Sequence, residues 1–233
     1  MDTARRTQTY GHYCLMAQTL DVLGDRWTLL VVRDLVHGPR RFTDLADTLG
    51  GITPKTLTQR LRALEHEGIV AADREAGRRE VRYRLTPAGQ ELVPVLEQLA
   101  RWGLRNALRP PEPGEPTHPE HLLWALRLKL EDAGAALDPV RWLVRVAGES
   151  HVLGFDGERW TLTRGETSEP DVTVTATRTA LAKFLTGPPS AREAEQPELT
   201  VTGGREAVRT MLDTIAVFPF GPGRAHRGSN VGA

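Results

Sequence analysis

Apolar residues recur at helical spacing through most of the first 105 residues, and glycine or proline interrupts each run. The pattern predicts helices over 13–23, over 26–37, over a short stretch capped by Thr43, and over 54–67. Thr53 stands where a helix N-cap belongs, and Pro54 follows at the first helical position. The helix over 54–67 therefore has a strong start signal.

Two strand-like runs follow this helix. IVAADRE and EVRYRLT flank the turn AGRR, which predicts a β-hairpin. A last helix is expected over 87–105, with a kink at Pro94, because proline has no N–H to donate inside a helix. Helix, helix, short helix, turn, helix, hairpin and helix is the order of a winged helix-turn-helix domain.

The helix over 54–67 has two different faces. Leu57, Leu61 and Leu64 form a stripe that can pack inward. The opposite face carries side chains that can donate hydrogen bonds to base edges and phosphates. Arginines at the hairpin tip, within GRREVRYR, could reach phosphates beside this helix. We therefore predict that DNA is bound by Thr53, Lys55, Thr56, Thr58, Gln59, Arg62, Arg78 and Arg79. The alternative is a solvated helix face with no partner.

The second half of the chain changes pattern. Four short runs, WLVRVAG, HVLGFDG, RWTLTRG and DVTVTAT, alternate apolar and polar residues, as expected of an antiparallel sheet with one covered face. A helix precedes them, and a helix, the strand LTVTG and a final helix follow. The fold class is therefore multi-domain: an N-terminal, mostly helical α+β winged helix-turn-helix, then a C-terminal α+β domain whose antiparallel sheet is covered by helices.

Composition places the boundaries of these parts. The stretch RPPEPGEPTH, residues 109–118, holds four prolines and reads as a semi-rigid linker. We predict a DNA-binding and dimerisation domain over 1–108, an effector domain over 119–220 and a disordered tail over 221–233. The chain carries 30 Lys and Arg and 30 Asp and Glu. Residues 1–108 hold 16 basic and 13 acidic residues, which leaves 14 and 17 for the remainder, so only the first half is mildly basic.

Several classes of function have no support in the sequence. No phosphate-binding glycine loop, HExxH, CxxC or GxSxG motif is present, so we expect no enzyme, no cofactor and no metal site. One cysteine, Cys14, excludes an internal disulfide and is typical of a reducing compartment. No apolar run is long enough to span a membrane, and the N-terminus shows no secretory signal. A cytoplasmic protein is expected.

The N-terminal half resembles the HxlR family of winged-helix transcriptional regulators, a branch near the MarR type. The resemblance rests on LGDRWTLLVVRDLVHGPRRFTDL, GGITPKTLTQRLRALEHEGIV and VRYRLTPAGQELVPVLEQLARWG. It implies a homodimer closed by the first helix and the helix after the hairpin, bound to the two half-sites of a double-stranded operator. The apolar stripe within 92–102 independently suits a dimer seam. The predicted interface residues are Met16, Leu20, Leu92, Val95, Leu96, Leu99 and Trp102.

The second half resembles the sterol-carrier-protein type two domain. GFDGERWTLTRGETSEPDVTVTATRTALAKFLTG and LTVTGGREAVRTMLDTIAVF carry that resemblance, by pattern and order. It implies an apolar tunnel between sheet and helices that binds a lipophilic small molecule. The tunnel would be lined by Phe155, Trp160, Leu162, Phe184, Met211 and Ile215. The alternative is that these side chains simply fill the core.

We therefore interpret the chain as a dimeric, sequence-specific DNA-binding transcriptional regulator, with repression as the default. Its C-terminal domain would take an apolar small-molecule effector. Two alternatives remain open at this point. One is a redox-sensing regulator that switches through Cys14 with a structural C-terminal domain, since some family members sense oxidants through an N-terminal cysteine. Against it stands the interpretation of Cys14 as a buried, inert residue of the first helix. The other is a lipid-binding or carrier protein.

Overall fold

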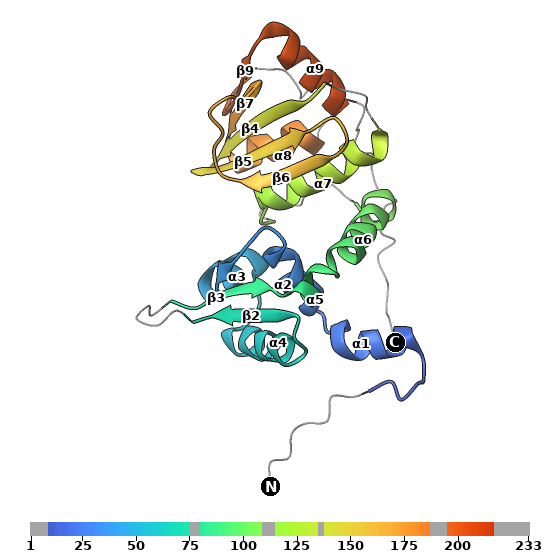
Figure 1. Ribbon diagram of the computed structural model, residues 1–233. Helices are drawn as coiled ribbons and strands as arrows, with labels where there is room; N and C mark the ends of the chain where they lie inside the picture. Colours follow the sequence, from blue (N-terminus) through green and yellow to red (C-terminus); the bar gives the residue numbers. More distant parts are fainter. Residues whose placement is uncertain (1–8, 75–79, 109–114, 135–137, 187–194, 217–233) are drawn as a thin grey trace, which may run out of the picture. The chain divides into compact units, whose positions relative to one another are not determined.

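The computed structural model describes residues 9–74, 80–108, 115–134, 138–186 and 195–216 (Figure 1). By its internal contacts the chain divides into two compact units, residues 1–96 and 97–233. The division falls inside helix α6 (Val93–Asn106). The predicted linker follows this helix, and its residues 109–114 lie outside the described residues, as do the predicted tail and residue 220. The predicted domain limits of 108, 118 and 220 therefore stay predictions.

The N-terminal unit has the predicted winged helix-turn-helix order. Its elements are α1 (Leu15–Leu23), α2 (Thr28–Leu35), β1 (Arg40–Arg41), α3 (Phe42–Leu49), α4 (Pro54–His66), β2 (Val70–Asp73), β3 (Arg82–Leu85) and α5 (Pro87–Gln90). The three strands form an antiparallel sheet in the order β1-β3-β2. Leucines and valines spaced for one face of each helix are buried here, among them Val31, Leu35, Leu45, Leu57 and Leu61.

Two local predictions for this unit were wrong. The helix expected over 87–105 with a kink is two helices, α5 and α6, separated at residues 91–92. Pro94 is the second residue of α6, where it breaks the helix instead of bending it, because its ring clashes with the carbonyl four residues earlier. Helix α3 begins at Phe42, so Thr43 is not its cap; the Asp44 carboxylate instead accepts a hydrogen bond from the backbone N–H of Arg41 at 3.0 Å.

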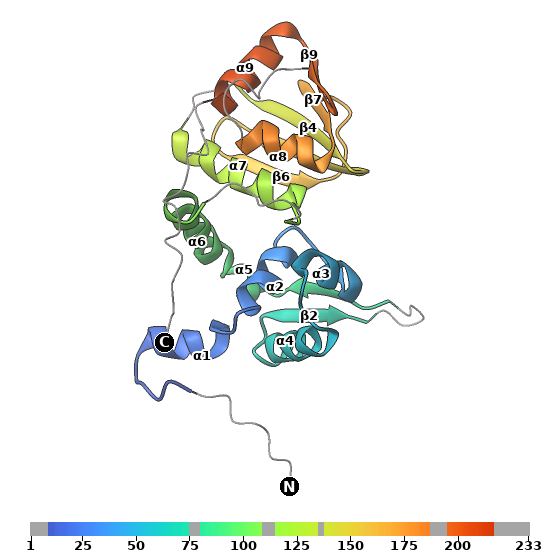
Figure 2. The ribbon, with the colours of Figure 1, turned by 180° about the vertical axis from the view of Figure 1, so that it is seen from behind.

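The C-terminal unit is an α+β domain, as predicted. Its elements after α6 are α7 (Pro119–Ala133), β4 (Val140–Val146), β5 (Glu149–Phe155), β6 (Trp160–Arg164), β7 (Val172–Ala176), α8 (Arg178–Thr186), β8 (Glu195–Gln196), β9 (Leu199–Gly203) and α9 (Arg205–Ala216). Six strands form one sheet in the order β6-β5-β4-β7-β9-β8. Helices α7 and α8 cover the same face of this sheet (Figure 2).

The sheet is mixed and not antiparallel throughout, which corrects the sequence-based expectation. Strand β7 pairs with β4 in parallel, with Trp142 opposite Val172 and Val146 opposite Ala176. The parallel pair arises because the β5–β6 hairpin lies on one side of β4, and the chain then crosses to the other side before β7 begins. The remaining pairs, including the predicted hairpin of β5 and β6, are antiparallel.

Alternation along the strands decides which face of the sheet is covered. Trp142, Val144 and Val146 of β4 point into the core with the leucines of α7, whereas Arg141 and Arg145 lie exposed on the opposite face. Among the described residues, no helix has both the length and the apolar composition that crossing a bilayer requires.

Candidate nucleic-acid interface

Helix α4 begins at the residues that its sequence marks as a start. The Thr53 hydroxyl oxygen accepts a hydrogen bond from the backbone N–H of Thr56 at 3.2 Å, and the two hydroxyl oxygens lie 2.8 Å apart. Pro54 occupies the first helical position, where its missing N–H removes no helical bond. These contacts fix the first turn of α4, so the side chains that follow have a defined direction.

The two faces of α4 separate as predicted. Leu57, Leu61 and Leu64 are buried, with exposed fractions of 2% or less. Lys55, Gln59 and Arg62 recur at the same helical spacing on the other side, and all three are exposed. The core therefore anchors α4 by one stripe and presents the other to solvent.

The exposed side chains of α4 differ in how many of their hydrogen-bond donors are already used within the protein. The Thr58 hydroxyl donates to the carbonyl oxygen of Pro54 at 2.8 Å, so its one hydrogen is already used. Thr53 and Thr56 share a hydroxyl hydrogen bond, which leaves one hydrogen between them. With the residues that the structure describes, Lys55, Gln59 and Arg62 make no side-chain hydrogen bond and no ion pair. Phosphates accept hydrogen bonds only, so these three are the strongest candidates for contacts to DNA.

The stem of the predicted wing holds its arginines in ion pairs. Arg84 of β3 donates to Asp73 of β2 at 3.1 Å, and Arg74 lies 3.5 Å from Glu65 of α4. Glu80 contacts Arg41 and lies 3.7 Å from Arg82. Arg78 and Arg79, the predicted phosphate contacts at the tip, fall in residues 75–79, outside the described residues.

The pairing of Glu65 and Glu80 with arginines was missed by sequence reasoning. Glu80 stands inside the basic run GRREVRYR, and an acid in such a run is the signal that could have found it. Its carboxylate connects Arg41, before α3, with Arg82 of the wing stem. This contact restrains the base of the wing relative to the helix-turn-helix.

Tyr83 of β3 lies between the wing and α4. Burial raises the pKa of its phenol, Glu65 raises it further, and Arg74 and Arg62 act in the opposite direction. The raised pKa keeps the phenol neutral at pH 7, as a hydrogen-bond donor beside α4. Arg60 lies 3.3 Å from Asp25, a contact that ties α4 to the loop after α1.

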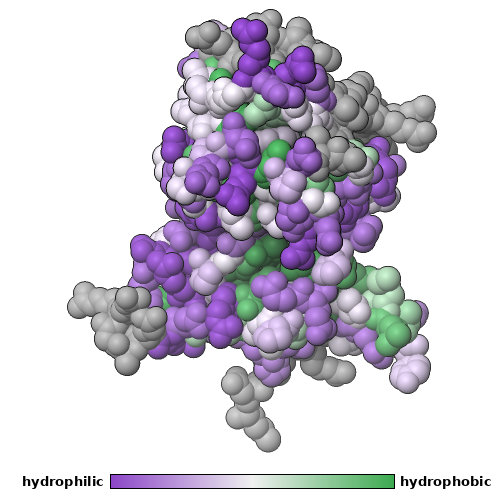
Figure 3. Space-filling model, turned by 45° about the horizontal axis from the view of Figure 1, so that its top comes forward, coloured by the Kyte–Doolittle hydropathy of each residue, from purple (hydrophilic) through white to green (hydrophobic). Residues whose placement is uncertain are grey.

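The residues predicted to form a dimer seam are mostly exposed in the single chain. On α1, Met16 is 66% exposed, and Leu20 is also exposed; Figure 3 shows hydrophobic residues gathered over this helix at the lower right. On α6, Val95, Leu99 and Trp102 are exposed, and Trp102 reaches 58%. Two predicted seam residues are not exposed in the single chain: Leu92 is half-buried and Leu96 is buried.

The residues predicted to line an apolar tunnel lie mainly in the packed core. Trp160, Phe184, Met211 and Ile215 are buried in the cluster between sheet and helices, and Phe155 and Leu162 pack partly buried against it. Four of the six would have to move to admit a ligand, and the tunnel stays a prediction.

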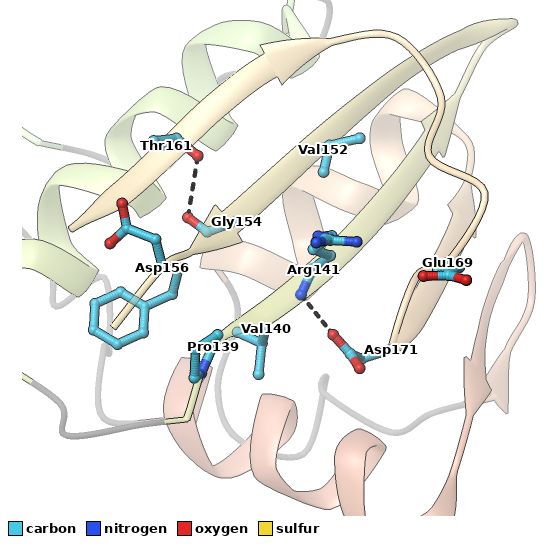
Figure 4. Close-up of a pocket in the computed structure, with 10 residues that line it drawn as sticks. Pro139, Val140, Arg141, Val152, Gly154, Asp156, Thr161, Glu169 and Asp171 are labelled. Atoms are coloured by element: carbon cyan, nitrogen blue, oxygen red, sulfur yellow. Dashed lines mark hydrogen bonds between the residues drawn. The ribbon is translucent and has the colours of Figure 1, made fainter. Parts of the chain in front are cut away.

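A hollow of 560 Å³ lies elsewhere, on the sheet face opposite the core (Figure 4). Arg141 donates its backbone N–H to the Asp171 carboxylate at 2.7 Å beside it, and the Thr161 hydroxyl donates to the Gly154 carbonyl oxygen at 3.3 Å. Val152, Asp156 and Glu169 complete most of its wall.

Cys14 precedes the first residue of α1 and is exposed, so the expectation of a buried cysteine is wrong for the single chain. Among the described ranges, no three His, Cys, Asp or Glu side chains gather as a metal site would require. His118 and His121 pack edge to face, with ring centroids 5.2 Å apart.

Comparison with known proteins agrees with this geometry. Residues 22–110 match the family described as HxlR-like helix-turn-helix. An HTH-type transcriptional regulator of Synechocystis sp., sll1512, is 43% identical over 95 residues, which are 40% of this chain and 70% of that protein. The regulator Rv3095 of Mycobacterium tuberculosis is 40% identical over 101 residues, 42% of this chain and 62% of that protein.

Among solved structures, the reduced form of the transcriptional regulator YodB from B. subtilis is 31% identical, with a TM-score of 0.36; the match covers 40% of this chain and 92% of YodB. The family match ends at residue 110, so the sheet of the C-terminal unit lies beyond it. Both the family and the relatives are helix-turn-helix transcription regulators and not enzymes. The chain therefore belongs to the HxlR-like helix-turn-helix family.

Proposed function

We propose that this protein is a sequence-specific, dimeric transcriptional repressor, in which α4 enters the major groove of a double-stranded operator. The observation that carries the proposal is the exposed face of Lys55, Gln59 and Arg62, opposite a fully buried leucine stripe. Arginine pairs with guanine through two hydrogen bonds and glutamine pairs similarly with adenine, while lysine contacts phosphate. Bound across an operator, such a protein represses by excluding polymerase.

The proposed dimer rests on the apolar surfaces of α1 and α6. Met16 and Leu20 on one helix, and Val95, Leu99 and Trp102 on the other, are exposed in the single chain. Large apolar side chains exposed in this way on each helix mark an interface with another protein chain. In a twofold dimer the same surface serves both subunits, and two copies of α4 are presented to half-sites about 34–36 Å apart, one turn of DNA.

Selection from a pool of random duplexes tests this function. The purified protein should enrich an inverted repeat, and sedimentation of the complex should give two chains per duplex. A matched protein with Lys55, Gln59 and Arg62 all changed to alanine should enrich nothing, while its circular dichroism spectrum stays unchanged. Failure of the unaltered protein to enrich any sequence would show that the exposed face of α4 does not read DNA.

The C-terminal unit is proposed as a fused effector module. Phe155 and Leu162, only partly buried at the edge of the core, support a site for an apolar small molecule, in keeping with the resemblance to a sterol-carrier-type domain. A ligand would change operator binding only by binding the DNA-competent and incompetent states unequally. Mass spectrometry of protein purified from cells tests this: mass that is lost on denaturation reveals a bound molecule, whereas an unchanged mass contradicts an occupied site.

The redox alternative has one supporting observation, the exposure of Cys14. With a single cysteine in the sequence, a protein disulfide could form only between two chains. The Cys14→Ser variant separates the two candidates. If DNA binding by the unaltered protein is lost on oxidation and that of Cys14→Ser is retained, the redox alternative holds; equal behaviour of both proteins removes it.

A further inference from the structure

Five charged side chains join α6 to α7 within the C-terminal unit. Arg101 of α6 lies 3.0 Å from Glu131 and 2.7 Å from Asp132, both on α7. Arg127 of α7 lies 2.5 Å from Glu131 and also contacts Glu97 of α6. The side chains of Arg101 and Arg127 are only 14% and 12% exposed, so solvent screens these pairs less than it screens surface pairs. The Glu131 carboxylate is the centre, because each of its oxygens contacts a different arginine.

The charged face of α6 lies opposite the apolar face proposed for dimerisation. Glu97 and Arg101 are one helical turn apart on one side. Val95, Leu99 and Trp102 recur at the same period on the other side and are exposed. Helix α6 is therefore held by α7 through its charges and is free to meet a second chain through its apolar residues. A change at Glu131 acts directly on the helix that carries this apolar face.

Glu131 also borders a hollow of 310 Å³ at the C-terminal end of α7. The wall is apolar where Leu130, Phe155 and Trp160 meet, and the two aromatic ring centroids lie 5.1 Å apart. The polar part of the wall comes from Glu131, Glu158 and Arg159. A space of this size falls at the small end of ligand pockets, and its wall is about as polar as it is apolar.

Charge decides what such a hollow would accept. Arg159 lies 3.7 Å from Asp156, so its charge is partly balanced, while Glu158 makes no ion pair with any residue that the structure describes. Behind the wall, three carboxylates of the α6–α7 cluster face two guanidinium groups. The wall residues Glu158 and Arg159, counted with Asp156 beside them, and the cluster behind the wall therefore each carry one more negative than positive charge. A cation is therefore attracted to this hollow and an anion is repelled.

We propose that the hollow bounded by Leu130, Glu131, Phe155, Glu158, Arg159 and Trp160 is an effector site for a small organic cation with an aromatic body, and that its occupation loosens α6 from α7. The aromatic body would lie against the partly buried ring of Phe155, beside the edge of Trp160, and the cationic head would approach Glu131 and Glu158. This head competes with Arg101 for one oxygen of Glu131. The link between Arg101 and Glu131 then weakens, and α6 gains freedom to move.

Burial raises the pKa of Glu131, and Glu97 raises it further, while Arg127 and Arg101 lower it. Its charged form therefore depends on neighbouring cations, and a ligand cation is a natural additional partner. The consequence for operator binding rests on the proposed function, because it requires α6 to form the dimer seam. The existence of the binding site does not depend on that function.

Three probes with one body and different heads test the site: 4-phenylbutylamine, 4-phenylbutanol and 4-phenylbutyrate. Titration calorimetry on the full chain without DNA should detect the amine at millimolar concentration and neither of the others. Glu158→Gln removes an exposed carboxylate from the wall and should weaken binding of the amine about two- to fivefold. Glu206→Gln, on α9 and outside the hollow's lining, makes the same change of charge and should bind like the unaltered protein.

Hydrogen exchange measures the second half of the proposal. Saturating amine should speed amide exchange in residues 98–106 of α6, and 4-phenylbutyrate should leave it unchanged. Binding of all three probes alike, or full affinity in Glu158→Gln, would overturn the site, and amine binding without faster exchange would overturn the link to α6. If the unaltered protein did not bind DNA, the proposed function would be contradicted. The calorimetry and hydrogen-exchange results would still test the binding site, because both are measured without DNA.

Discussion

Gly89 lies so close to the carbonyl oxygen of Ile69 that a Cβ on Gly89 would meet this oxygen at 2.2 Å. The same carbonyl accepts the backbone N–H of Thr86 at 3.0 Å, and the Thr86 hydroxyl caps α5 by accepting the N–H of Gly89 at 3.1 Å. The start of α5 is thus packed against the chain that leads from α4 into the wing. This junction sets where β2 and α5 lie relative to the end of α4.

Gly89→Ala should therefore lower the free energy of unfolding by about 1–3 kcal/mol, the usual cost of overpacking a filled site. The matched control is Gly103→Ala in α6, where a Cβ would have no neighbour within 4 Å. That change should stabilise the helix by about 0.5–1 kcal/mol, since alanine loses less backbone entropy than glycine. Urea unfolding of both variants measures the difference, and equal effects would show that the Gly89–Ile69 approach relaxes without cost.

Lys55→Gln should weaken binding to operator and to unrelated DNA alike, because a phosphate contact carries no sequence information. The slope of log affinity against log salt should fall by about 1. Fluorescence anisotropy over a range of salt concentrations gives both quantities. An unchanged slope would mean that the Lys55 ammonium does not displace counterions from DNA, and its place on the interface would then be wrong.

Met16→Glu and Leu99→Glu should each disrupt the dimer. An unpaired carboxylate buried in an apolar seam costs several kcal/mol, so the dimer dissociation constant should rise about 100-fold or more. Gln18→Glu is the control, because Gln18 is exposed on the face of α1 opposite Met16. Sedimentation equilibrium gives the dimer dissociation constant of the two seam variants and of the control. If both seam variants formed dimers of unchanged stability, the interface would have to lie on another surface of the protein.

Glu166 provides a pH-dependent test of the C-terminal sheet. Hydrogen bonds from Arg145 and from the Ser150 hydroxyl lower the pKa of its carboxyl from 4.5 to about 2. The folded-state pKa lies below the unfolded one, so this group stabilises the fold above pH 4.5, and that contribution is lost as the pH falls toward 2. Carboxyl-detected NMR titration should show the low pKa directly.

Arg145→Ala should return the Glu166 pKa toward its ordinary value, because it removes the first cause of the shift. The pKa of Asp156 is also lowered, by backbone N–H groups of Arg159 and Glu158, and it should not respond. A Glu166 pKa that stays low in Arg145→Ala would assign the effect to Ser150 instead.

The sequence predicted the N-terminal domain well because its signals are local. Thr53-Pro54 starts α4, and the leucine stripe of α4 has only one face to bury. The break between α5 and α6 could not be distinguished from a kink, because Pro94 is compatible with both until the carbonyl four residues earlier is placed. The parallel pairing of β4 with β7 depends on where the chain crosses, which period-two alternation does not encode.

The ion pairs at the candidate site could not be predicted from the sequence either. The exposed face of α4 follows from helical period alone, but the partner of Arg74 lies at the end of α4 and that of Arg84 lies on the neighbouring strand β2. The same holds for the α6–α7 cluster, whose members are about 30 residues apart along the chain. The predicted apolar tunnel came from resemblance, and packing places most of its residues in the core.

The most direct test of the account is the affinity of Arg62→Ala for the selected operator, measured beside Arg178→Ala as a control that removes an equal charge from α8. We predict that Arg62→Ala loses about 1–3 kcal/mol on the operator and relaxes sequence preference at one base pair of each half-site. Arg178→Ala should bind like the unaltered protein. If Arg62→Ala keeps full affinity and full sequence preference, α4 does not read the operator through this face, and the central claim is contradicted.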